Sequence, residues 1–562
     1  MKIVVVGGVA GGASTAARIR RLDEQAQIIM FEKGPHVSFS NCALPYRLSD
    51  CVNSDQKLIM MTPEKFAHQY NIQARLNHEV ISIEKDEKKV KVKNLINNEE
   101  FEEDYDKLIL APGASAIIPN IKGIDQAHTF IVKNVADVSK LYAFLKEHKI
   151  RKTAVLGGGF IGVEVCENLI HAGYEVSLIE AMPQILRTYD DDMVQILHKE
   201  MMDKGVNLIL NDRAIGFEGS NVLLESGKTV ESEAVILALG VRPDTLLAKN
   251  AGLSLNERGA IQVDANYCTS DPDIYAVGDA IEVFNALTHQ PMMLSLAGPA
   301  QKQARAAADH IYGRSVRNHG YIGSSCIQVF DYQAACTGLN AAQCEALGFS
   351  YDSVYIIPQD KVGIMPQSYP LHLKLLFEIP TGRVLGAQAI SKGEAVKRID
   401  VIATLIKFNG TIDDLKDLEL CYAPPFSTAK DPVNYAGLVA GNLLEKAFHQ
   451  VHVDKVRELV ESKAYIIDVR EEQEFANGHL ITAINIPLSQ LRKRMNEIPK
   501  DRPVYLHCRS GQRSYNAVMA LQGAGYTNVY NISGSFLGVC LYEYFNDKTL
   551  NRIPIVTSYN FN

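Results

Sequence analysis

The sequence predicts a multidomain α/β protein that contains two dinucleotide-binding units. Residues 2–12 combine an apolar run, a glycine-rich turn and the start of a helix, and residues 153–162 repeat that order. A strand, a glycine turn and a helix in succession are typical of nucleotide-binding α/β domains. The chain has 562 residues. Because one hydrophobic core rarely serves more than about 300 residues, we expect roughly three to five domains.

The composition is that of an ordinary soluble globular protein, with 47% apolar and 22% charged residues. The formal net charge of −8 offers no general attraction to nucleic acid or to an anionic membrane. No apolar run is long enough to span a bilayer, and the N-terminal run is broken by glycines, as in a strand and turn rather than a signal peptide. We therefore expect a cytoplasmic protein with neither a nucleic-acid nor a membrane partner.

The ten cysteines form no CxxC pair and no Cys/His cluster at zinc spacing. We therefore expect no metal site. In a reducing compartment most of these thiols are expected to be buried and unmodified. A cysteine that performs chemistry must be identified from its local sequence.

The first glycine-rich turn contains Gly7, Gly11 and Gly12, although Val9 stands where a strict GxGxxG pattern has glycine. Glycines let the backbone approach a pyrophosphate, and the following helix offers its N-terminal N–H groups to the phosphates. Glu32 ends the next predicted strand, where a carboxylate can accept hydrogen bonds from a ribose diol. The alternative is a tight strand-to-helix turn without a ligand.

The second turn matches the pattern fully, because Gly157, Gly159 and Gly162 form a complete GxGxxG. Glu180 ends the next predicted strand. A carboxylate at this position favours a free 2′-hydroxyl and repels a 2′-phosphate. The second unit is therefore predicted to prefer NADH over NADPH.

The pattern changes after about residue 320. Residues 322–445 contain alternating strands, turn signals and an amphipathic helix at residues 398–408, which together are typical of an α+β domain. A further α/β unit begins near residue 452.

Three more segments accompany the glycine-rich turns: residues 105–114 (YDKLILAPGA), 234–243 (AVILALGVRP) and 269–280 (TSDPDIYAVGDA). The five ordered motifs together resemble those of the pyridine nucleotide-disulfide oxidoreductases, a family of two-dinucleotide flavoproteins, over residues 1–445. The resemblance implies that the first unit binds FAD, that the second binds NAD(P)H, and that an α+β dimerisation domain follows.

The resemblance also implies roles for single residues. Asp279 matches an aspartate that contacts the flavin ribityl chain. Phe160 matches an aromatic residue that lies over the flavin and moves aside for nicotinamide, with a buried core aromatic as the alternative. The implied cofactor-binding residues are Gly7, Gly11, Gly12, Glu32, Ala111, Gly113, Asp279, Ala297, Gly157, Gly159, Phe160, Ile161, Gly162, Glu180 and Gly240.

Many members of this family carry a CxxxxC pair that forms an internal disulfide beside the flavin. Here Cys42 has Arg47 at the second position, and the next cysteine, Cys51, has no matching role. Residues 38–46 (SFSNCALPY) resemble the coenzyme A-disulfide reductases, which use one flavin-adjacent cysteine. The resemblance implies that the Cys42 thiolate attacks a disulfide or persulfide and that reduced flavin releases it from the mixed disulfide.

The thiolate is the reactive form of a cysteine, so we expect the surroundings of Cys42 to lower its pKa. The candidate stabilisers are a helix N-terminus, Asn41 and the flavin.

Two other functions remain open. Related NADH oxidases and peroxidases cycle one cysteine through a sulfenic acid, but they usually have a histidine where this chain has Ala10. The third interpretation is a sulfur carrier or redox sensor. The complete second glycine motif, with Glu180, argues against it, since a pure carrier needs no nicotinamide site.

The coenzyme A-disulfide reductase branch is homodimeric, and its interface domain presents two tyrosines to the partner's cysteine. Tyr422, in residues 421–434 (CYAPPFSTAKDPVN), matches one of them, whereas Ile364 stands at the other position. The missing phenol argues against coenzyme A disulfide as the best substrate. A persulfide has a smaller leaving group and makes less demand on a second hydroxyl.

Residues 465–488 and 507–514 (HCRSGQRS) resemble a rhodanese domain. Cys508 follows a strand and opens a loop that leads into a helix, where N–H groups and the helix dipole stabilise a thiolate or persulfide anion. The resemblance implies that Cys508 carries sulfane sulfur, with positive charge from Arg509 and Arg513. A phosphatase loop is the alternative, but the flanking sequence favours rhodanese. The residues expected to support the fold are Asp468, Arg470, His479 and His507.

These resemblances imply FAD-binding segments at residues 1–150 and 266–321, an NAD(P)H-binding domain at 151–265, a dimerisation domain at 322–445 and a rhodanese domain at 452–562. The predicted protein is a homodimeric FAD-dependent reductase that uses NADH, or NADPH, to reduce coenzyme A persulfide, polysulfide or coenzyme A disulfide. The predicted catalytic residues are Cys42, Asn41, Tyr422, Cys508 and Arg513, and the candidate coenzyme A-binding residues are Ser38, Asn41, Arg18 and Arg21.

Overall fold

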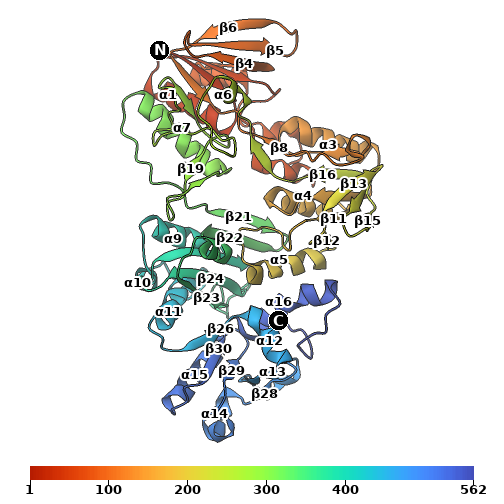
Figure 1. Ribbon diagram of the computed structural model, residues 1–562, viewed down its shortest axis with the longest axis vertical. Helices are drawn as coiled ribbons and strands as arrows, with labels where there is room; N and C mark the ends of the chain where they lie inside the picture. Colours follow the sequence, from red (N-terminus) through yellow and green to blue (C-terminus); the bar gives the residue numbers. More distant parts are fainter. Residues whose placement is uncertain (562) are drawn as a thin grey trace. The chain divides into compact units, whose positions relative to one another are not determined.

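The computed structural model describes residues 1–561 (Figure 1). Contacts within the chain divide it into two compact units. The first unit comprises Met1–Pro183 and Ile209–Tyr321, and the second comprises Gln184–Leu208 and Ile322–Asn562. In residues 1–561, no helix combines the length and apolar character needed to cross a membrane. The predicted domain boundaries are finer than this division and stay predictions.

A five-stranded parallel sheet carries the first glycine-rich turn, with strand order β18-β7-β1-β2-β3. Strand β1 lies between β2 and β7, so the strand order reverses at its carboxyl end, where open α/β sheets bind ligands. Helices α1 (Ala10–Leu22) and α7 (Ala297–Ile311) pack against each other beside this sheet (Figure 1). The strands are β1 (Lys2–Val6), β2 (Gln27–Glu32), β3 (Gln73–Leu76), β7 (Lys107–Leu110) and β18 (Ile274–Ala276).

A second parallel sheet repeats this arrangement for the second glycine-rich turn. Four of its strands lie in the first unit, in the order β11-β10-β16-β9, so that β10 is again flanked on both sides. Helix α4 (Phe160–His171) follows β10, as α1 follows β1. The strands are β9 (Thr129–Phe130), β10 (Lys152–Leu156), β11 (Glu175–Ile179) and β16 (Ala234–Leu237).

Smaller elements complete the first unit. Two three-stranded antiparallel sheets have the orders β4-β5-β6 and β13-β14-β15. Their strands are β4 (His78–Glu84), β5 (Lys89–Asn94), β6 (Glu100–Asp104), β13 (Ala214–Glu218), β14 (Asn221–Leu224) and β15 (Thr229–Val230). Further strands of the first unit are β8 (Ala114–Ala116), β17 (Val241–Pro243), β19 (Val283–Phe284) and β20 (Pro291–Met292). Its further helices are α2 (Pro63–Tyr70), α3 (Val135–Glu147) and α6 (Leu246–Asn250).

The second unit begins with an antiparallel sheet of order β21-β22-β25-β24-β23. All eight residues of β25 are buried, as are seven of the eight in β24, so this pair of strands forms the centre of the core. The strands are β21 (Ser325–Val329), β22 (Tyr332–Gly338), β23 (Tyr351–Ile356), β24 (Leu371–Glu378) and β25 (Val384–Ser391). The helices are α5 (Asp191–Asp203), α8 (Ala341–Ala346), α9 (Val396–Lys407), α10 (Ile412–Asp417) and α11 (Pro432–Leu444).

A buried ion cluster ties α5 to the antiparallel sheet. The ammonium group of Lys374, on β24, lies 2.9 Å from Asp190 and 2.8 Å from Asp192, at the start of α5. Burial alone would lower the pKa of Lys374, but the two carboxylates raise it. Removing one partner of such a cluster would leave an uncompensated buried charge, so the contact fixes α5 on the sheet.

The last part of the second unit is a parallel sheet of order β26-β30-β29-β27-β28. Cys508 follows β29 directly. The strands are β26 (His449–Val451), β27 (Tyr465–Asp468), β28 (Ile484–Asn485), β29 (Val504–His507) and β30 (Val529–Ile532), and the helices are α12 (Val456–Glu461), α13 (Glu472–Ala476), α14 (Leu488–Arg494), α15 (Gln512–Gly523) and α16 (Ser535–Thr549).

The observed architecture agrees with the predicted fold class. Both glycine-rich turns connect a strand to a helix in a parallel sheet, the middle of the chain is α+β, and the C-terminal part is α/β. The amphipathic segment expected at residues 398–408 is helix α9.

Candidate active sites

The first glycine-rich turn packs so closely that two of its positions admit only glycine. Gly7 has a φ of +95°, and a Cβ there would lie 2.1 Å from the carbonyl oxygen of Ala111. A Cβ on Gly12 would lie 1.8 Å from the carbonyl oxygen of Gly7. The backbone at the start of α1 therefore carries no side chain at these positions, and its N–H groups stay accessible, as a pyrophosphate site requires.

A carboxylate fixes this turn from the neighbouring strand. Glu32 accepts hydrogen bonds from the N–H groups of Gly8 and Gly34, both at 2.8 Å. A carboxylate has about four acceptor positions, so Glu32 keeps capacity for the hydroxyl groups of a ribose. The donor set and the open helix N-terminus fit an adenine dinucleotide such as FAD.

The second turn has the same construction. A Cβ on Gly162 would lie 1.9 Å from the carbonyl oxygen of Gly157, and Glu180 accepts hydrogen bonds from Gly158 at 2.7 Å and from Met182 at 2.8 Å. Gly159 differs, because a Cβ there would meet no protein atom within 4 Å. Packing within the chain does not explain this glycine, whereas the predicted approach of a pyrophosphate would explain it.

The remaining predicted cofactor residues lie at the ends of elements around the two turns. Phe160 and Ile161 form the first turn of α4, and Ile161 is exposed. Gly240 and Gly113 both have positive φ angles, of +96° and +73°. The others follow a strand or begin a helix: Ala111 after β7, Asp279 after β18 and Ala297 at the start of α7. Their contacts with a cofactor stay predictions.

Cys42 is exposed and lies in a single 3-10 turn, Asn41–Ala43. The expectation that a helix N-terminus stabilises its thiolate is wrong, since a three-residue turn carries almost none of the aligned dipoles of an α-helix. The groups of the chain itself raise the pKa of Cys42, first by burial and then through the charges of Glu164 and Asp279. Lys133 acts in the opposite direction.

Two charged groups near Cys42 were not predicted from the sequence. Lys133 lies 3.7 Å from Asp279, which is itself a predicted flavin contact. The carboxyl of Glu164, on α4, has a pKa raised to about 7 by burial and by the charge of Glu167. A group with this pKa exchanges a proton near neutral pH. Both residues come from segments far from Cys42 in the sequence, where no local pattern marks them.

Arg47 fills the position of the missing second cysteine and has a structural role. It is buried and donates to Asp55 and Asp50, both at 2.7 Å, while its guanidinium lies 3.6 Å from the centre of the Tyr142 ring. This side chain holds the segment that follows Cys42, and no internal disulfide can form there.

A cavity of about 370 Å³ lies beside α1 and contains three of the four predicted coenzyme A-binding residues. Ser38, Arg18 and Arg21 line it, whereas Asn41 does not. The charge of Arg18 is already paired with Asp309, whose oxygen accepts from its Nε at 2.8 Å. The lining residues that the sequence did not indicate include Tyr70, Phe66, Met61, Gln301 and Arg305.

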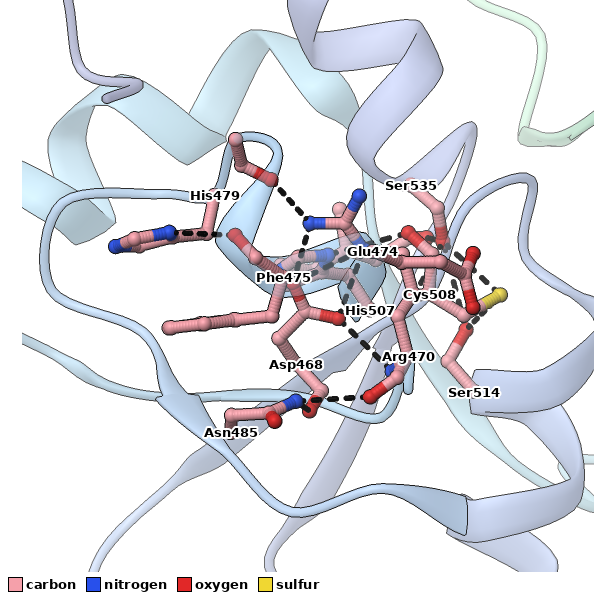
Figure 2. A network of polar contacts seen from close by, with 12 residues as sticks. Asp468, Arg470, Glu474, Phe475, His479, Asn485, His507, Cys508, Ser514 and Ser535 are labelled. Atoms are coloured by element: carbon pink, nitrogen blue, oxygen red, sulfur yellow. Dashed lines mark hydrogen bonds and ion pairs between the residues drawn. The ribbon is translucent and has the colours of Figure 1, made fainter. Parts of the chain in front are cut away.

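The sulfur of Cys508 is surrounded by hydrogen-bond donors (Figure 2). The N–H of Gly511 lies 3.2 Å from it, the hydroxyl of Ser514 3.6 Å and the hydroxyl of Ser535 4.0 Å. Donors in this arrangement stabilise negative charge on sulfur. Cys508 itself is only 1% exposed, so a persulfide there would be shielded from solvent.

The two arginines of this loop differ in their partners. Arg513 donates two hydrogen bonds of 2.7 Å to Glu474, which raise its pKa and neutralise its charge. Burial lowers the pKa of Arg509, and the charges of Arg470 and Arg513 add to that effect. The Cys508 side chain also raises the pKa of Arg513, through a hydrogen bond and its charge, so Arg513 contacts Cys508 as well as Glu474. Within residues 1–561, Arg509 forms no ion pair within 4.0 Å.

The polar residues around this loop support the fold. The guanidinium of Arg470 bonds to Asp468 and to the carbonyl of Gly478, and all of these contacts are buried (Figure 2). His479 stacks on Phe475 with ring centres 3.8 Å apart. These residues fix the strand ends on which the Cys508 loop rests.

Tyr422 and Ile364 both lie on exposed segments of the second unit. Tyr422 is 49% exposed and Ile364 is 88% exposed. Exposure of this kind is compatible with a role at a dimer interface. The predicted approach of Tyr422 to a partner's Cys42 stays a prediction.

Comparison with known proteins identifies the family. Residues 1–304 match the pyridine nucleotide-disulphide oxidoreductases, residues 324–432 match the dimerisation domain of that family, and residues 452–541 match the rhodanese-like domain. The coenzyme A disulfide reductase of Staphylococcus epidermidis is 36% identical over 440 residues, which cover 78% of this chain and 99% of the relative.

Two solved structures resemble nearly the whole chain. Reduced CoADR-RHD of Bacillus anthracis has a TM-score of 0.94 and 43% identity, covering 97% of this chain and 98% of the other. A NAD-dependent persulfide reductase from A. fulgidus has a TM-score of 0.91 and 33% identity, covering 95% and 99%.

The chain is therefore a flavoprotein oxidoreductase built on two dinucleotide-binding domains. It belongs to the pyridine nucleotide-disulfide oxidoreductase family and carries, in addition, a C-terminal rhodanese-like domain. The predicted family and the predicted rhodanese domain are confirmed. The family uses FAD and NAD(P)H, which agrees with the construction of the two glycine-rich turns.

The open position of Gly159 yields a test of the second dinucleotide site. Gly159→Ala should raise the KM for NADH by about tenfold, equivalent to roughly 1.4 kcal/mol, because the added methyl would meet only the ligand. Flavin content and folding should not change. Gly441→Ala, on α11, is a matched control, since its Cβ also meets no protein atom within 4 Å. An unchanged KM in Gly159→Ala would show that no pyrophosphate approaches this residue.

The charges near Cys42 give opposite predictions for two variants. Glu164→Gln should accelerate alkylation of Cys42 and Lys133→Met should slow it, because Glu164 raises and Lys133 lowers the pKa of this thiol. Since the pKa of Glu164 is about 7, the acceleration should be clear at about pH 8 and nearly absent at about pH 6. Mass spectrometry of the Cys42 peptide measures both rates. Equal rates in all three proteins would contradict this account.

Proposed function

We propose that this enzyme uses NADH to reduce a persulfide, a polysulfide or coenzyme A disulfide through Cys42. A persulfide gives thiol and sulfide, a polysulfide gives sulfide, and the disulfide gives thiol alone. The observation that carries the proposal is the combination of two sulfur sites in one chain. One is an exposed single cysteine whose usual partner position is occupied by Arg47, and the other is the shielded Cys508 with its donors. Names of relatives that include coenzyme A disulfide reductase and persulfide reductase support it.

FAD bound at the first turn would supply two-electron transfer from NADH to sulfur. The chain supplies the nucleophile: the Cys42 thiolate attacks the inner sulfur of a persulfide, forms a mixed disulfide and expels hydrosulfide. Two electrons and a proton then return Cys42 to the thiolate and free the organic thiol. Lys133 lowers the pKa of Cys42, and Glu164 holds a proton near neutral pH.

The cavity beside α1 supports a substrate of the coenzyme A class. Arg21 and Arg305 offer positive charge to phosphate groups, and Phe66 and Tyr70 offer aromatic surface to a base. Ser38 also lines the cavity and belongs to the same segment as Cys42. This proximity in sequence would let a pantetheine arm extend from the cavity toward the thiol.

The proposed cofactor preference rests on Glu180. Its carboxylate is fixed by two backbone N–H groups at the end of β11, where it would accept from a ribose hydroxyl and repel a 2′-phosphate. We further propose that Cys508 carries the sulfane sulfur, that the enzyme is a cytoplasmic homodimer, and that Tyr422 acts at the interface.

The single-cysteine mechanism is tested by Cys42→Ser. This variant should keep its FAD but lose more than about a hundredfold in NADH-dependent reduction of coenzyme A persulfide, because a serine hydroxyl cannot replace the thiolate. Cys51→Ser is the matched control, since Cys51 is also exposed and follows in the same region. Retained turnover in Cys42→Ser would remove Cys42 from the mechanism.

A further inference from the structure

The Cys508 loop lies between the N-termini of two helices. Helix α15 begins at Gln512, directly after the loop, and α16 begins at Ser535. Both helix starts are held by residues that precede the rhodanese-like domain in the chain. The contacts at α16 are the more consequential, because α16 bonds to Cys508 itself.

Ser535 and its neighbours bind the Cys508 loop through several contacts. The hydroxyl of Ser535 accepts a hydrogen bond from the Cys508 N–H at 3.2 Å and lies 4.0 Å from its sulfur. The N–H of Phe536 donates to the carbonyl of Cys508 at 3.1 Å, and the N–H of Leu537 donates to that of Arg509 at 3.0 Å. A displacement of the start of α16 would therefore move the sulfur.

Tyr355, on β23 of the dimerisation domain, fills the turn that precedes Ser535. A Cβ on Gly534 would lie 2.7 Å from Cε1 of Tyr355, so the ring rests directly on the backbone of this turn. Gly534 has a φ of +75°, which only glycine adopts readily. The hydroxyl of Ser533 also donates to the carbonyl of Tyr355 at 3.2 Å. The ring and the turn thus fit together at van der Waals distance.

Tyr355 is rigidly held in turn. It is 4% exposed, and its hydroxyl shares a hydrogen bond of 2.7 Å with Nδ1 of His372, on the neighbouring strand β24. Burial, together with the charge of Arg509, lowers the pKa of His372 to about 3, so the imidazole is neutral at physiological pH. Burial also raises the pKa of Tyr355. The pair therefore keeps one protonation state and one geometry under working conditions.

The second helix start is held in a similar way. The side-chain amide of Gln512 donates to the hydroxyl of Tyr435, on α11, at 3.1 Å. One turn further along α15, the hydroxyl of Tyr515 accepts from Asn442, also on α11, at 3.1 Å. Helix α11 directly follows the residues that match the dimerisation domain, so both sides of the Cys508 loop contact segments that precede the rhodanese-like domain.

We propose that Tyr355 is a positioning residue for the Cys508 sulfur, so that the rhodanese-like site is complete only when it is docked on the dimerisation domain. The inference rests on the proposed role of Cys508 as the sulfur carrier. Tyr355 acts by fixing the Gly534–Ser535 turn, and Ser535 in turn fixes the backbone and sulfur of Cys508. The reductase portion of the chain thereby sets the activity of the sulfur-transfer portion.

The test uses thiosulfate as the sulfur donor and the full-length flavoprotein. In the first step the Cys508 thiolate attacks the outer sulfur of thiosulfate, an S–S bond forms, and sulfite leaves with the electron pair of the broken bond. Cyanide then takes the outer sulfur as thiocyanate and restores the thiolate. The measured quantities are the single-turnover rate constant and the amplitude of sulfite release.

Tyr355→Ala should lower the rate constant by about tenfold to a hundredfold, as expected when a reacting atom is displaced by about 1 Å. Its amplitude, FAD content and NADH-dependent activity at Cys42 should stay near those of the wild type. Tyr355→Phe keeps the ring and should retain most of the rate constant. Tyr351→Phe is the matched control on the same strand, because its hydroxyl contacts Glu345 and not the rhodanese-like domain.

The rate constant and the amplitude of sulfite release distinguish a displaced sulfur from a partly unfolded protein. A lowered amplitude with an unchanged rate constant in Tyr355→Ala would mean partial unfolding and would overturn the proposal, as would an unchanged rate constant at full amplitude. If Tyr355→Ala fails to fold, Tyr355→Leu replaces it. This variant keeps an apolar side chain, so its rate constant for sulfite release should fall by less, and a wild-type rate constant would also overturn the proposal.

Cys508→Ser tests separately whether Cys508 is the sulfur carrier. Sulfite release that survives in that variant removes Cys508 as the carrier.

Discussion

The reductase depends on one repeated contact, in which a carboxylate at the end of a strand binds the N–H of a glycine-rich turn. Glu32 does this for the first turn and Glu180 for the second. Each contact holds a loop whose glycines already pack against neighbouring carbonyl oxygens at distances that no side chain permits. The result is two bare helix N-termini at the carboxyl ends of parallel strands, where dinucleotides bind. Every later step of the proposed chemistry requires both cofactors to be held in these two places.

The two cysteines proposed to act on sulfur have different surroundings. Cys42 is exposed on a short turn, and the charges of Glu164 and Asp279 oppose its ionisation while Lys133 favours it. Cys508 is shielded from solvent and faces the N–H of Gly511 and two hydroxyl groups. An exposed thiol is suited to attack on a diffusible substrate. A buried sulfur that faces hydrogen-bond donors is suited to hold a persulfide. The contacts of Tyr355 with Ser533 and Gly534 join the Cys508 loop to the dimerisation domain.

Much of the fold was predictable because its signals are local. Glycine turns, strand-end carboxylates and the cysteine loop of the rhodanese-like domain are each contained within a few residues. The surroundings of these motifs were not predictable, since Lys133 and Glu164 reach Cys42 from distant segments. The expected helix N-terminus at Cys42 was wrong, because the chain forms only a 3-10 turn there. Arg18 and Arg513 were predicted site residues, and only the folded chain shows that they also pair with Asp309 and Glu474.

We propose that this flavoprotein reduces the sulfur–sulfur bonds of persulfides, polysulfides or disulfides with electrons from NADH. The most direct measurement is anaerobic NADH oxidation with coenzyme A persulfide, polysulfide and coenzyme A disulfide in parallel, with simultaneous detection of sulfide. We expect NADH oxidation without oxygen, with one sulfide released for each NADH consumed when the persulfide is the substrate. Oxidation of NADH that requires oxygen or peroxide and releases no sulfide would contradict it.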